Sequence, residues 1–485
     1  MGNLTALQDQ TLLRTQCLVG GRWIDAQSGE SLAVVNPASQ LELARVPRLS
    51  PTEVKSAIDA AETAFQSWRL VPAQKRAHVL RSWFDLLLQH EQDLARLVVL
   101  EQGKPYKEAL AEVRYAASYF EFYAEEAKRI YGEVLNAPFP QAKVLIEKQP
   151  VGVVGIITPW NFPIAMMARK VAPALAAGCT CVVKPDEKTP LSAFALMELG
   201  CRAGVPPGVV NTVTGIPLEI GTAFTASKAV RKISFTGSTA VGKWLLRESA
   251  HTVKRVTMEL GGNAPFIVFE DAELDAAVDG LILAKFRNAG QTCVCANRIF
   301  VQRSVLQEFT TRLQKAVQSL NVGEGFSGCD VGPLIDQKAL DKTAFLVQEA
   351  LNQGATLCCG GEPHALGGLF YSPTVLTDVR PGMALFSEEQ FAPIAAIVAF
   401  DTDQEVIALA NDTTAGLASY FYTQSMSRVW QVAEALDFGM VAVNSGVVSS
   451  AAVPFGGVKE SGMGREGARQ GLEDYLTTKY IHWSK

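Results

Sequence analysis

Two cysteines one residue apart, Cys293 and Cys295, stand in the polar segment NAGQTCVCANR. Their spacing fits neither a zinc site, which needs Cys-x2-Cys and two further ligands, nor a thioredoxin-like Cys-x-x-Cys motif. A buried structural cysteine normally has apolar neighbours, whereas this flank contains asparagine, glycine and glutamine. The segment leaves two interpretations open: inert thiols, or a thiolate nucleophile in a flexible loop.

Two further short motifs contain residues suited to catalysis. Asn161 lies between two prolines in PWNFP, where a stiffened loop can hold its amide to donate a hydrogen bond to an oxyanion. Glu259 follows an apolar run and precedes two glycines in MELGG, which makes it either a general base or a residue of a surface turn. The five histidines are scattered and no Cys-x2-Cys pair occurs, so we expect no metal site.

The segments FTGSTAVG and KPDE each follow an expected β-strand. Gly237 and Ser238 stand where a helix begins, so free N–H groups and a hydroxyl there can bind a phosphate. Glu187 can accept hydrogen bonds from a ribose diol, and Lys184 can reach ribose or phosphate oxygens. The first segment lacks the middle glycine of Gly-x-Gly-x-x-Gly, and the second also fits a solvated turn.

The elements that must position these motifs change character near residue 150. Before it, the first third of the chain is predicted to be helical, and one helix begins with Ser50 as N-cap, Pro51 at the first position and Glu53 completing a capping box. After it, short apolar β-rich runs alternate with helical segments. This alternation predicts βαβ units and a parallel, doubly wound sheet, which binds nucleotides at the carboxyl ends of its strands.

The composition excludes several classes of protein. A net charge of −5 without a basic run argues against nucleic-acid binding. Nine cysteines in 485 residues do not make a disulfide framework, and they suit a reducing compartment. The first residues show no secretory or transit pattern, and the most apolar stretch is broken by polar residues and prolines. We therefore expect a soluble, cytoplasmic protein without a membrane or nucleic-acid partner.

The motifs PWNFP, KPDE, FTGSTAVG, MELGGNAP, GQTC, EEQFAP and PFGGVKESGMGREG, in this order, resemble the aldehyde dehydrogenase superfamily over essentially the whole chain. KFRNAGQTCVCANR and the last motif look most like succinate-semialdehyde dehydrogenases. The resemblance implies NAD(P)-dependent oxidation of succinate semialdehyde to succinate through a thiohemiacetal and a thioester on Cys293. Glutarate semialdehyde or another short aldehyde is the alternative substrate. A cysteine ester or thioester hydrolase, or a non-catalytic scaffold that kept the fold, is the alternative from another class.

The resemblance also implies roles for matched positions. Cys293 would be the nucleophile, Glu259 the general base, and Asn161 with the backbone N–H of Cys293 the oxyanion hole. Glu466, in GREG, would help to relay protons. The residues that would contact the cofactor are Trp160, Lys184, Glu187, Gly237, Ser238, Glu389 and Phe391. Ala392 departs from the pattern, which has glycine after that phenylalanine.

A clamp for the terminal carboxylate of the substrate is implied by the resemblance at Arg169, Arg287 and Ser449. The alternative for the two arginines is an ordinary ion pair on a helix surface. Cys295 is either a bystander that lines the pocket or a redox partner that forms a reversible disulfide with Cys293.

The expected cofactor is NAD in preference to NADP. Glu187 would accept a hydrogen bond from the ribose 2′-hydroxyl and would repel a 2′-phosphate. Asp186 would add to this repulsion and Lys184 would offset part of it, so weaker use of NADP is also expected.

The predicted fold class is α/β: a doubly wound Rossmann-like cofactor domain, a second α/β catalytic domain and a small β-extension. The resemblance implies that residues 1–130 and 150–258 form the NAD(P)-binding domain and residues 259–445 the catalytic domain. Residues 131–149 and 470–485 would be oligomerisation segments. The implied assembly is a homodimer or homotetramer.

Overall fold

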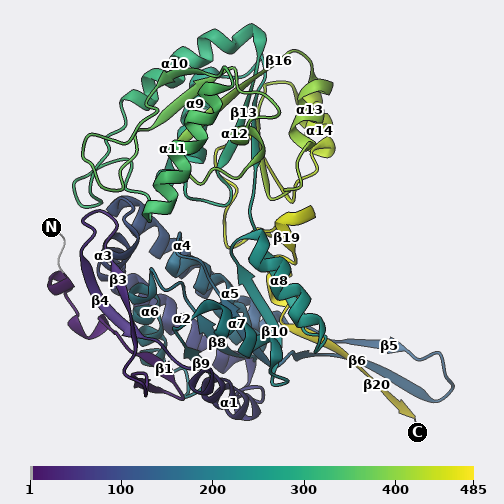
Figure 1. Cartoon of the computed structure of the whole chain (residues 1–485). Helices are drawn as coiled ribbons and strands as arrows, with labels where there is room; N and C mark the ends of the chain where they lie inside the picture. Colours follow the sequence, from purple (N-terminus) through teal and green to yellow (C-terminus); the bar gives the residue numbers. More distant parts are fainter. Residues whose placement is uncertain (1–3, 485) are drawn as a thin grey trace.

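The computed structural model describes residues 4–484, which form two lobes and a long β arm that projects from one of them (Figure 1). Each lobe is built around one mainly parallel sheet with helices packed against it. The predicted α/β class with a doubly wound sheet is therefore confirmed.

The first lobe contains a six-stranded sheet in the order β19-β11-β10-β7-β8-β9, in which only β19 runs antiparallel to its neighbour. Its strands are β7 (Val153–Ile157), β8 (Thr180–Lys184), β9 (Val210–Thr212), β10 (Val230–Thr236), β11 (Arg255–Glu259) and β19 (Gly462–Met463). Its helices are α1 (Pro51–Trp68), α2 (Ala73–Gln89), α3 (Glu91–Gln102), α4 (Tyr106–Glu126), α5 (Pro163–Ala177), α6 (Pro190–Arg202), α7 (Pro217–Ala226), α8 (Thr239–Ala250) and α15 (Ala468–Glu473).

The second lobe contains a seven-stranded sheet in the order β14-β15-β16-β13-β12-β17-β18, in which β14 is the antiparallel edge strand. Its strands are β12 (Ala264–Val268), β13 (Ala296–Gln302), β14 (Thr356–Cys359), β15 (Thr374–Thr377), β16 (Ile394–Phe400), β17 (Ala418–Tyr422) and β18 (Met440–Val443). Its helices are α9 (Leu274–Lys285), α10 (Leu306–Gln318), α11 (Gln337–Asn352), α12 (Ala384–Ser387), α13 (Asp403–Asn411) and α14 (Met426–Ala435).

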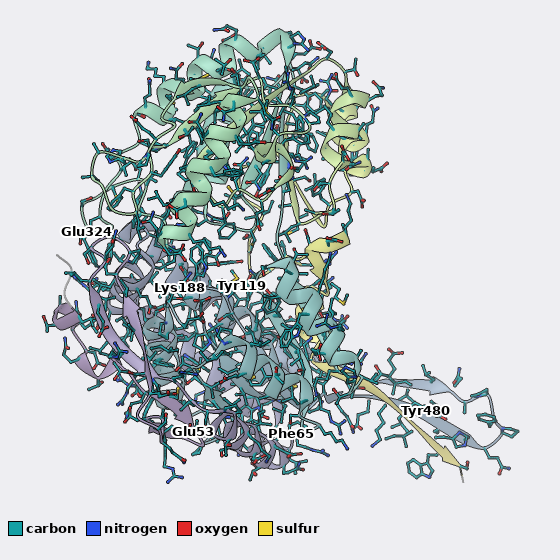
Figure 2. The ribbon with its side chains drawn as sticks, in the orientation of Figure 1. Glu53, Phe65, Tyr119, Lys188, Glu324 and Tyr480 are labelled. Carbon is teal, nitrogen blue, oxygen red and sulfur yellow. The ribbon has the colours of Figure 1, made fainter. Side chains whose placement is uncertain are left out.

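The arm is a three-stranded antiparallel sheet in the order β20-β6-β5. Its strands are β5 (Glu133–Asn136), β6 (Ala142–Pro150) and β20 (Leu476–Ser484), so the small β-extension of the predicted fold class is present. Figure 2 labels Tyr480 on this arm, far from Tyr119 and Lys188 in the body of the molecule. The arm exposes apolar side chains, among them Val134, Phe139 and Trp483.

The prediction for the first third of the chain was wrong in one part. The capping box of Ser50 and Glu53 begins α1 as expected, but residues 17–47 form two β-hairpins and no long helix. Their strands are β1 (Cys17–Val19), β2 (Arg22–Ile24), β3 (Ser31–Val35) and β4 (Glu42–Pro47). These strands are too short to give a clear alternation of polar and apolar residues, and they are stabilised by contacts with the first lobe.

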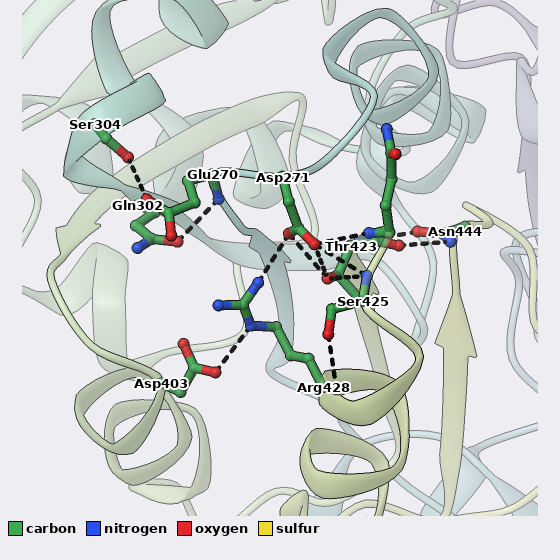
Figure 3. A network of polar contacts seen from close by, with 10 residues as sticks. Glu270, Asp271, Gln302, Ser304, Asp403, Thr423, Ser425, Arg428 and Asn444 are labelled. Carbon is green, nitrogen blue, oxygen red and sulfur yellow. Dashed lines mark hydrogen bonds and ion pairs between the residues drawn. The ribbon is translucent and has the colours of Figure 1, made fainter.

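A polar network holds the start of α14 against the loop after β12 (Figure 3). The Asp271 carboxylate accepts hydrogen bonds from the Thr423 hydroxyl at 2.8 Å and from the backbone N–H groups of Gln424 and Ser425. Arg428 donates to Asp271 and also to Asp403, each at 2.9 Å or less. Every oxygen of Asp271 thus has partners within the network, which indicates a structural role.

In the part of the chain that the structure describes, no helix is long and apolar enough to cross a membrane.

Candidate active site

A cavity of about 280 Å³ receives side chains from both lobes. α4 and α5 form one side of it, and the segments around Cys293 and Ser449 form the other. The lining residues with polar or reactive groups are Glu108, Glu112, Tyr115, Arg169, Arg287, Thr292, Cys293 and Ser449. The cavity therefore brings the predicted nucleophile together with all three predicted carboxylate-binding residues.

A strained turn precedes Cys293. Asn288, Ala289 and Gly290 all have φ between 54° and 74°, a conformation that costs of order 1 kcal/mol or more for each non-glycine residue. Hydrogen bonds hold the turn in place. The backbone N–H of Asn288 donates to Glu108 Oε2 at 2.8 Å, and Gln291 Nε2 donates to the carbonyl of Asn288 at 3.0 Å. Such a turn presents Cys293 to the cavity in one orientation.

Asn161 is connected to this turn. Its Nδ2 donates to the carbonyl of Gln291 at 3.1 Å, and its own carbonyl accepts from Asn288 Nδ2 at 3.1 Å and from Lys104 Nζ at 2.7 Å. Asn161 is buried and is not one of the residues that line the cavity, whereas its neighbour Phe162 is. The second N–H of Asn161 Nδ2 is not used in these hydrogen bonds. An oxyanion hole requires a free donor of this kind.

Two buried charged residues support the PWNFP loop, and no local pattern in the sequence marks either of them. Lys104 Nζ lies 2.6 Å from Glu112 Oε2, and both side chains are fully enclosed. The other oxygen of Glu112 accepts from the backbone N–H groups of Ile164 and Ala165 at the start of α5. The pair fixes the carbonyl of Asn161 and the first turn of α5 together.

The Cys293 thiol is only partly exposed, and its surroundings oppose its ionisation. Burial raises the pKa of Cys293 to about 12; the positive charges of Arg169 and Arg287 oppose this rise, and the carboxylates of Glu389 and Glu259 add to it. The thiol therefore needs a base to become a thiolate at neutral pH.

Glu259 stands at the end of β11 with its carboxylate buried. Its Oε2 has no hydrogen-bond partner among the described residues, and its Oε1 would lie 2.9 Å from a Cβ at Gly456. Burial raises the pKa of Glu259 well above 4.5, and the negative charge of Glu466 adds to the rise, although Arg169 and Lys170 oppose it. A carboxylate with a raised pKa and an unoccupied oxygen is suited to accept a proton.

Glu466 is buried between two cations rather than open to the cavity. Its Oε2 lies 2.6 Å from Arg169 Nε, and its Oε1 accepts from Lys170 Nζ. Arg169 is therefore not a surface residue, and it is already paired on one side. Its Nη2 has no hydrogen-bond partner among the described residues, so it can still bind a ligand in the cavity that it lines.

Arg287 differs from Arg169 because no described carboxylate forms an ion pair with it. Its guanidinium lies 5.5 Å from the centre of the Phe162 ring, and its Nε is buried without a hydrogen-bond partner. Ser449 lines the same cavity. Arg287 also interacts electrostatically with Glu108 in the same cavity, but without an ion pair its guanidinium is available to bind an anion.

The first-lobe sheet has the features of a dinucleotide site. The strand order reverses between β7 and β10, which is where such sheets bind nucleotides. The hydroxyls of Thr158 and Thr236, at the carboxyl ends of these two strands, are buried without partners in the described chain. Ser238 is the N-cap of α8, and a side chain at Gly237 would collide with Phe235, its Cβ 2.5 Å from the ring. These residues fit a bound pyrophosphate and ribose.

The loop of EEQFAP carries two of the predicted cofactor residues. Glu389 Oε1 accepts from the N–H of Gly262 at 3.1 Å, and burial raises the pKa of Glu389 to about 7. Phe391 has φ of 55° and packs edge-on against Trp160, with 5.7 Å between the ring centres. Phe391, and not Ala392, adopts the left-handed conformation, so glycine is not needed at position 392.

Lys184 and Glu187 form an ion pair of 2.7 Å at the tip of β8. Lys184 is buried, whereas about a third of the Glu187 side chain is exposed. Asp186 accepts from the backbone N–H of Lys188 at 3.0 Å, so it caps its own loop. The part of the chain that the structure describes contains no cluster of three or more His, Cys, Asp or Glu residues that could hold a metal ion.

Cys295 does not line the cavity, so that interpretation was wrong. Its thiol is buried and donates to the carbonyl of Lys285 at 3.6 Å, whereas Thr292, Cys293 and Val294 line the cavity. All nine cysteines are free in this structure, and the predicted disulfide with Cys293 stays a prediction.

A cysteine lies in a cavity lined by arginines, and the neighbouring doubly wound sheet has the features of a dinucleotide site at the carboxyl ends of its strands. This combination defines a dinucleotide-dependent enzyme with a catalytic cysteine. The chain belongs to the aldehyde dehydrogenase family, whose profile matches residues 23–481.

Characterised members of the family match almost the whole chain. The succinate-semialdehyde dehydrogenase [NADP(+)] of Escherichia coli K12 is 51% identical, over 98% of this chain and 99% of that enzyme. The glutarate-semialdehyde dehydrogenase of Pseudomonas aeruginosa is 50% identical, over 98% of this chain and 99% of its own length. The crystal structure of succinate-semialdehyde dehydrogenase from Burkholderia pseudomallei covers 99% of this chain and 100% of its own, at 50% identity and a TM-score of 0.98.

Proposed function

We propose that the protein oxidises succinate semialdehyde to succinate with NAD(P), through a thiohemiacetal and a thioester on Cys293. One observation carries this proposal: the same small cavity contains the Cys293 thiol and the Arg287 guanidinium, which has no ion pair with a described carboxylate. A short aldehyde with a terminal carboxylate satisfies both groups at once. Relatives that act on succinate and glutarate semialdehydes support the same class of substrate.

The residues around Cys293 have separate tasks in this scheme. The Cys293 thiol releases its proton to solvent and its sulfur attacks the aldehyde carbon, while Asn161 Nδ2 with the Cys293 backbone N–H stabilises the resulting oxyanion. The turn before Cys293 and the Lys104–Glu112 pair keep these donors in place. A bound NAD(P) would supply the acceptor for the hydride that leaves the thiohemiacetal carbon.

Glu259 acts as the general base in the second half of the reaction. It takes a proton from a water molecule that attacks the thioester carbon, which releases the acid and restores the Cys293 sulfur. Glu466 helps to move that proton away from Glu259, and its contacts with Arg169 and Lys170 hold it in position.

We further propose that NAD is preferred to NADP. The exposed carboxylate of Glu187 can accept from a ribose 2′-hydroxyl, whereas a 2′-phosphate would meet its negative charge. Lys184 already forms an ion pair with Glu187, so its positive charge offsets only part of this repulsion. The name of the Escherichia coli relative specifies NADP(+), so comparing kcat/KM for the two cofactors is a sharp test. Glu187→Gln should move the ratio toward NADP, and a wild-type preference for NADP would refute the electrostatic argument.

The main experiment is a panel of aldehydes with and without a terminal carboxylate, followed by the absorbance of the reduced cofactor. Succinate semialdehyde should give a higher kcat/KM than glutarate semialdehyde, propanal or butanal. The second candidate is glutarate semialdehyde, which has the same functional groups and one more methylene. A cysteine hydrolase would instead cleave esters at full rate without any cofactor.

The chain organisation and assembly complete the proposal. We assign residues 1–130 and 150–258 to cofactor binding and residues 259–445 to catalysis. Residues 131–149 and 470–485 would join subunits, supported by the exposed apolar side chains of the arm. We therefore propose a homodimer or homotetramer. Light scattering after gel filtration measures this oligomeric state directly. The free cysteines support a reducing, cytoplasmic location.

A further inference from the structure

Lys285 is a buried lysine that the proposed chemistry does not use. It is the last residue of α9, its side chain is fully enclosed, and no described carboxylate forms an ion pair with it. Its Nζ donates instead to Gln390 Oε1 at 2.6 Å and to Asn297 Oδ1 at 3.4 Å. Burying a lysine amine among neutral partners costs free energy. We therefore expect the hydrogen bonds of Lys285 to have a function that offsets this cost.

Gln390 occupies the middle of the loop that carries Glu389 and Phe391. Glu389 contacts Gly262 and Phe391 contacts Trp160, whereas the Gln390 side chain is buried in the core of the second lobe. Its Nε2 donates to the carbonyls of Asn297 and Leu385 at 2.8 and 3.0 Å. The amide is thus fully hydrogen-bonded, and Lys285 supplies the donor to its oxygen.

The same lysine also adjoins the nucleophile segment. The Cys295 thiol donates to the Lys285 carbonyl at 3.6 Å, and Gly290 passes so close that a Cβ there would lie 2.1 Å from the Ala392 carbonyl oxygen. Burial lowers the pKa of Lys285, and the neighbouring Cys295 thiol opposes that shift. The turn before Cys293 and the loop of Glu389 therefore touch each other and share one buried anchor.

We propose that Lys285 and Gln390 form a positioning pair that fixes residues 388–392 against the turn at residues 288–293. The pair links cofactor affinity to the reactivity of Cys293. Lys285 touches neither substrate nor cofactor, so it is a positioning residue. This inference rests on the proposed function, because it takes Glu389 and Phe391 as cofactor contacts.

The test uses the full-length variants Lys285→Met, Gln390→Met and the double variant. Binding of NAD and NADP is titrated by protein fluorescence, without substrate. Each single variant should bind the preferred cofactor about tenfold more weakly, the change expected for one charge-assisted hydrogen bond. The double variant should lose no more cofactor affinity than the single variant that binds the cofactor more weakly, because both changes remove the same hydrogen bond.

A second readout does not need the cofactor. Alkylation of Cys293 by iodoacetamide, followed by peptide mass spectrometry on ligand-free protein, should change rate several-fold in both single variants. In turnover, KM for the cofactor should rise while KM for the semialdehyde stays unchanged. A generally loosened fold would move both KM values.

Lys232→Met is the matched control, because Lys232 is a buried lysine on β10 in the other lobe. It should lower the unfolding temperature and leave cofactor affinity and Cys293 alkylation unchanged. Unchanged affinity in Lys285→Met, or losses that multiply in the double variant, would overturn the inference. If Lys285→Met does not fold, Gln390→Met alone decides by the same two readouts. Wild-type protein that binds neither NAD nor NADP would refute the proposed function, while the alkylation rates would still test the contact.

Discussion

Replacing Arg287 with alanine removes a cavity cation that has no ion pair with any carboxylate in the described chain. A substrate carboxylate would lose a bidentate partner and would be left in a cavity of about 280 Å³. Breaking a desolvated charge pair of this kind costs about 2–4 kcal/mol, which corresponds to a loss of roughly 30- to 900-fold in kcat/KM. Arg169 is already paired with Glu466, so it can replace Arg287 only in part.

The assay compares succinate semialdehyde with butanal, which has the same number of carbons and no carboxylate. Arg287→Ala should lose the stated factor with the semialdehyde and change less than about threefold with butanal, because butanal makes no charge contact. Arg303→Ala is the matched control, since Arg303 is exposed and paired with Asp401 at 2.7 Å. It should leave both substrates unaffected. An equal loss with both substrates would mean that Arg287 supports the adjoining turn and does not recognise the carboxylate.

Three further predictions concern the nucleophile, the base and the stability of the second lobe. Cys293→Ala should abolish oxidation while retaining cofactor binding, whereas Cys295→Ala should keep substantial activity; the reverse pattern in a turnover assay would exchange their roles. Glu259→Gln should keep a first burst of reduced cofactor and lose steady turnover. In the wild type, steady turnover should rise as pH passes upward through the raised pKa of Glu259, because the base must be deprotonated, and a flat profile would argue against this role. Asp271→Asn should lower the free energy of unfolding by about 1–3 kcal/mol. Burial raises the pKa of Asp271, but hydrogen bonds from Thr423 and Gln424 and the charge of Arg428 leave it lowered overall. Its stabilisation should thus be complete above about pH 4 and disappear as pH falls through the lowered pKa, so thermal unfolding of wild type and variant should converge in acid.

The sequence predicted those parts of the molecule whose signal is local. The capping box at Ser50 and the βαβ alternation after residue 150 depend on neighbouring residues, and the structure contains both. The cavity was predictable only through the family resemblance, because Arg169, Arg287 and Ser449 are far apart in the chain.

What the sequence did not reveal are contacts between distant segments. Lys104, between α3 and α4, and Glu112, within α4, resemble ordinary charged residues in the sequence, yet the fold encloses both and places Lys104 against the carbonyl of Asn161. The pairing of Arg169 with Glu466 joins residues almost 300 positions apart, and no periodicity marks it. Burial of a charge depends on what packs over it, and a single sequence does not contain that information.

The short strand β19 has a consequence for the order in which the protein folds during synthesis. It pairs with the end of β11, where Glu259 lies opposite Gly462, so the sheet edge at Glu259 is completed by residues made about 200 positions later. At roughly 5–20 residues per second, a ribosome needs about 10–40 s to cover that distance. Until then the first-lobe sheet presents an open edge and Glu259 lacks Gly456 and Glu466 as neighbours. On the proposed roles, Cys293 is made well before Glu259 is positioned as its base, so we expect the nascent chain to be inactive until residues 456–466 have emerged.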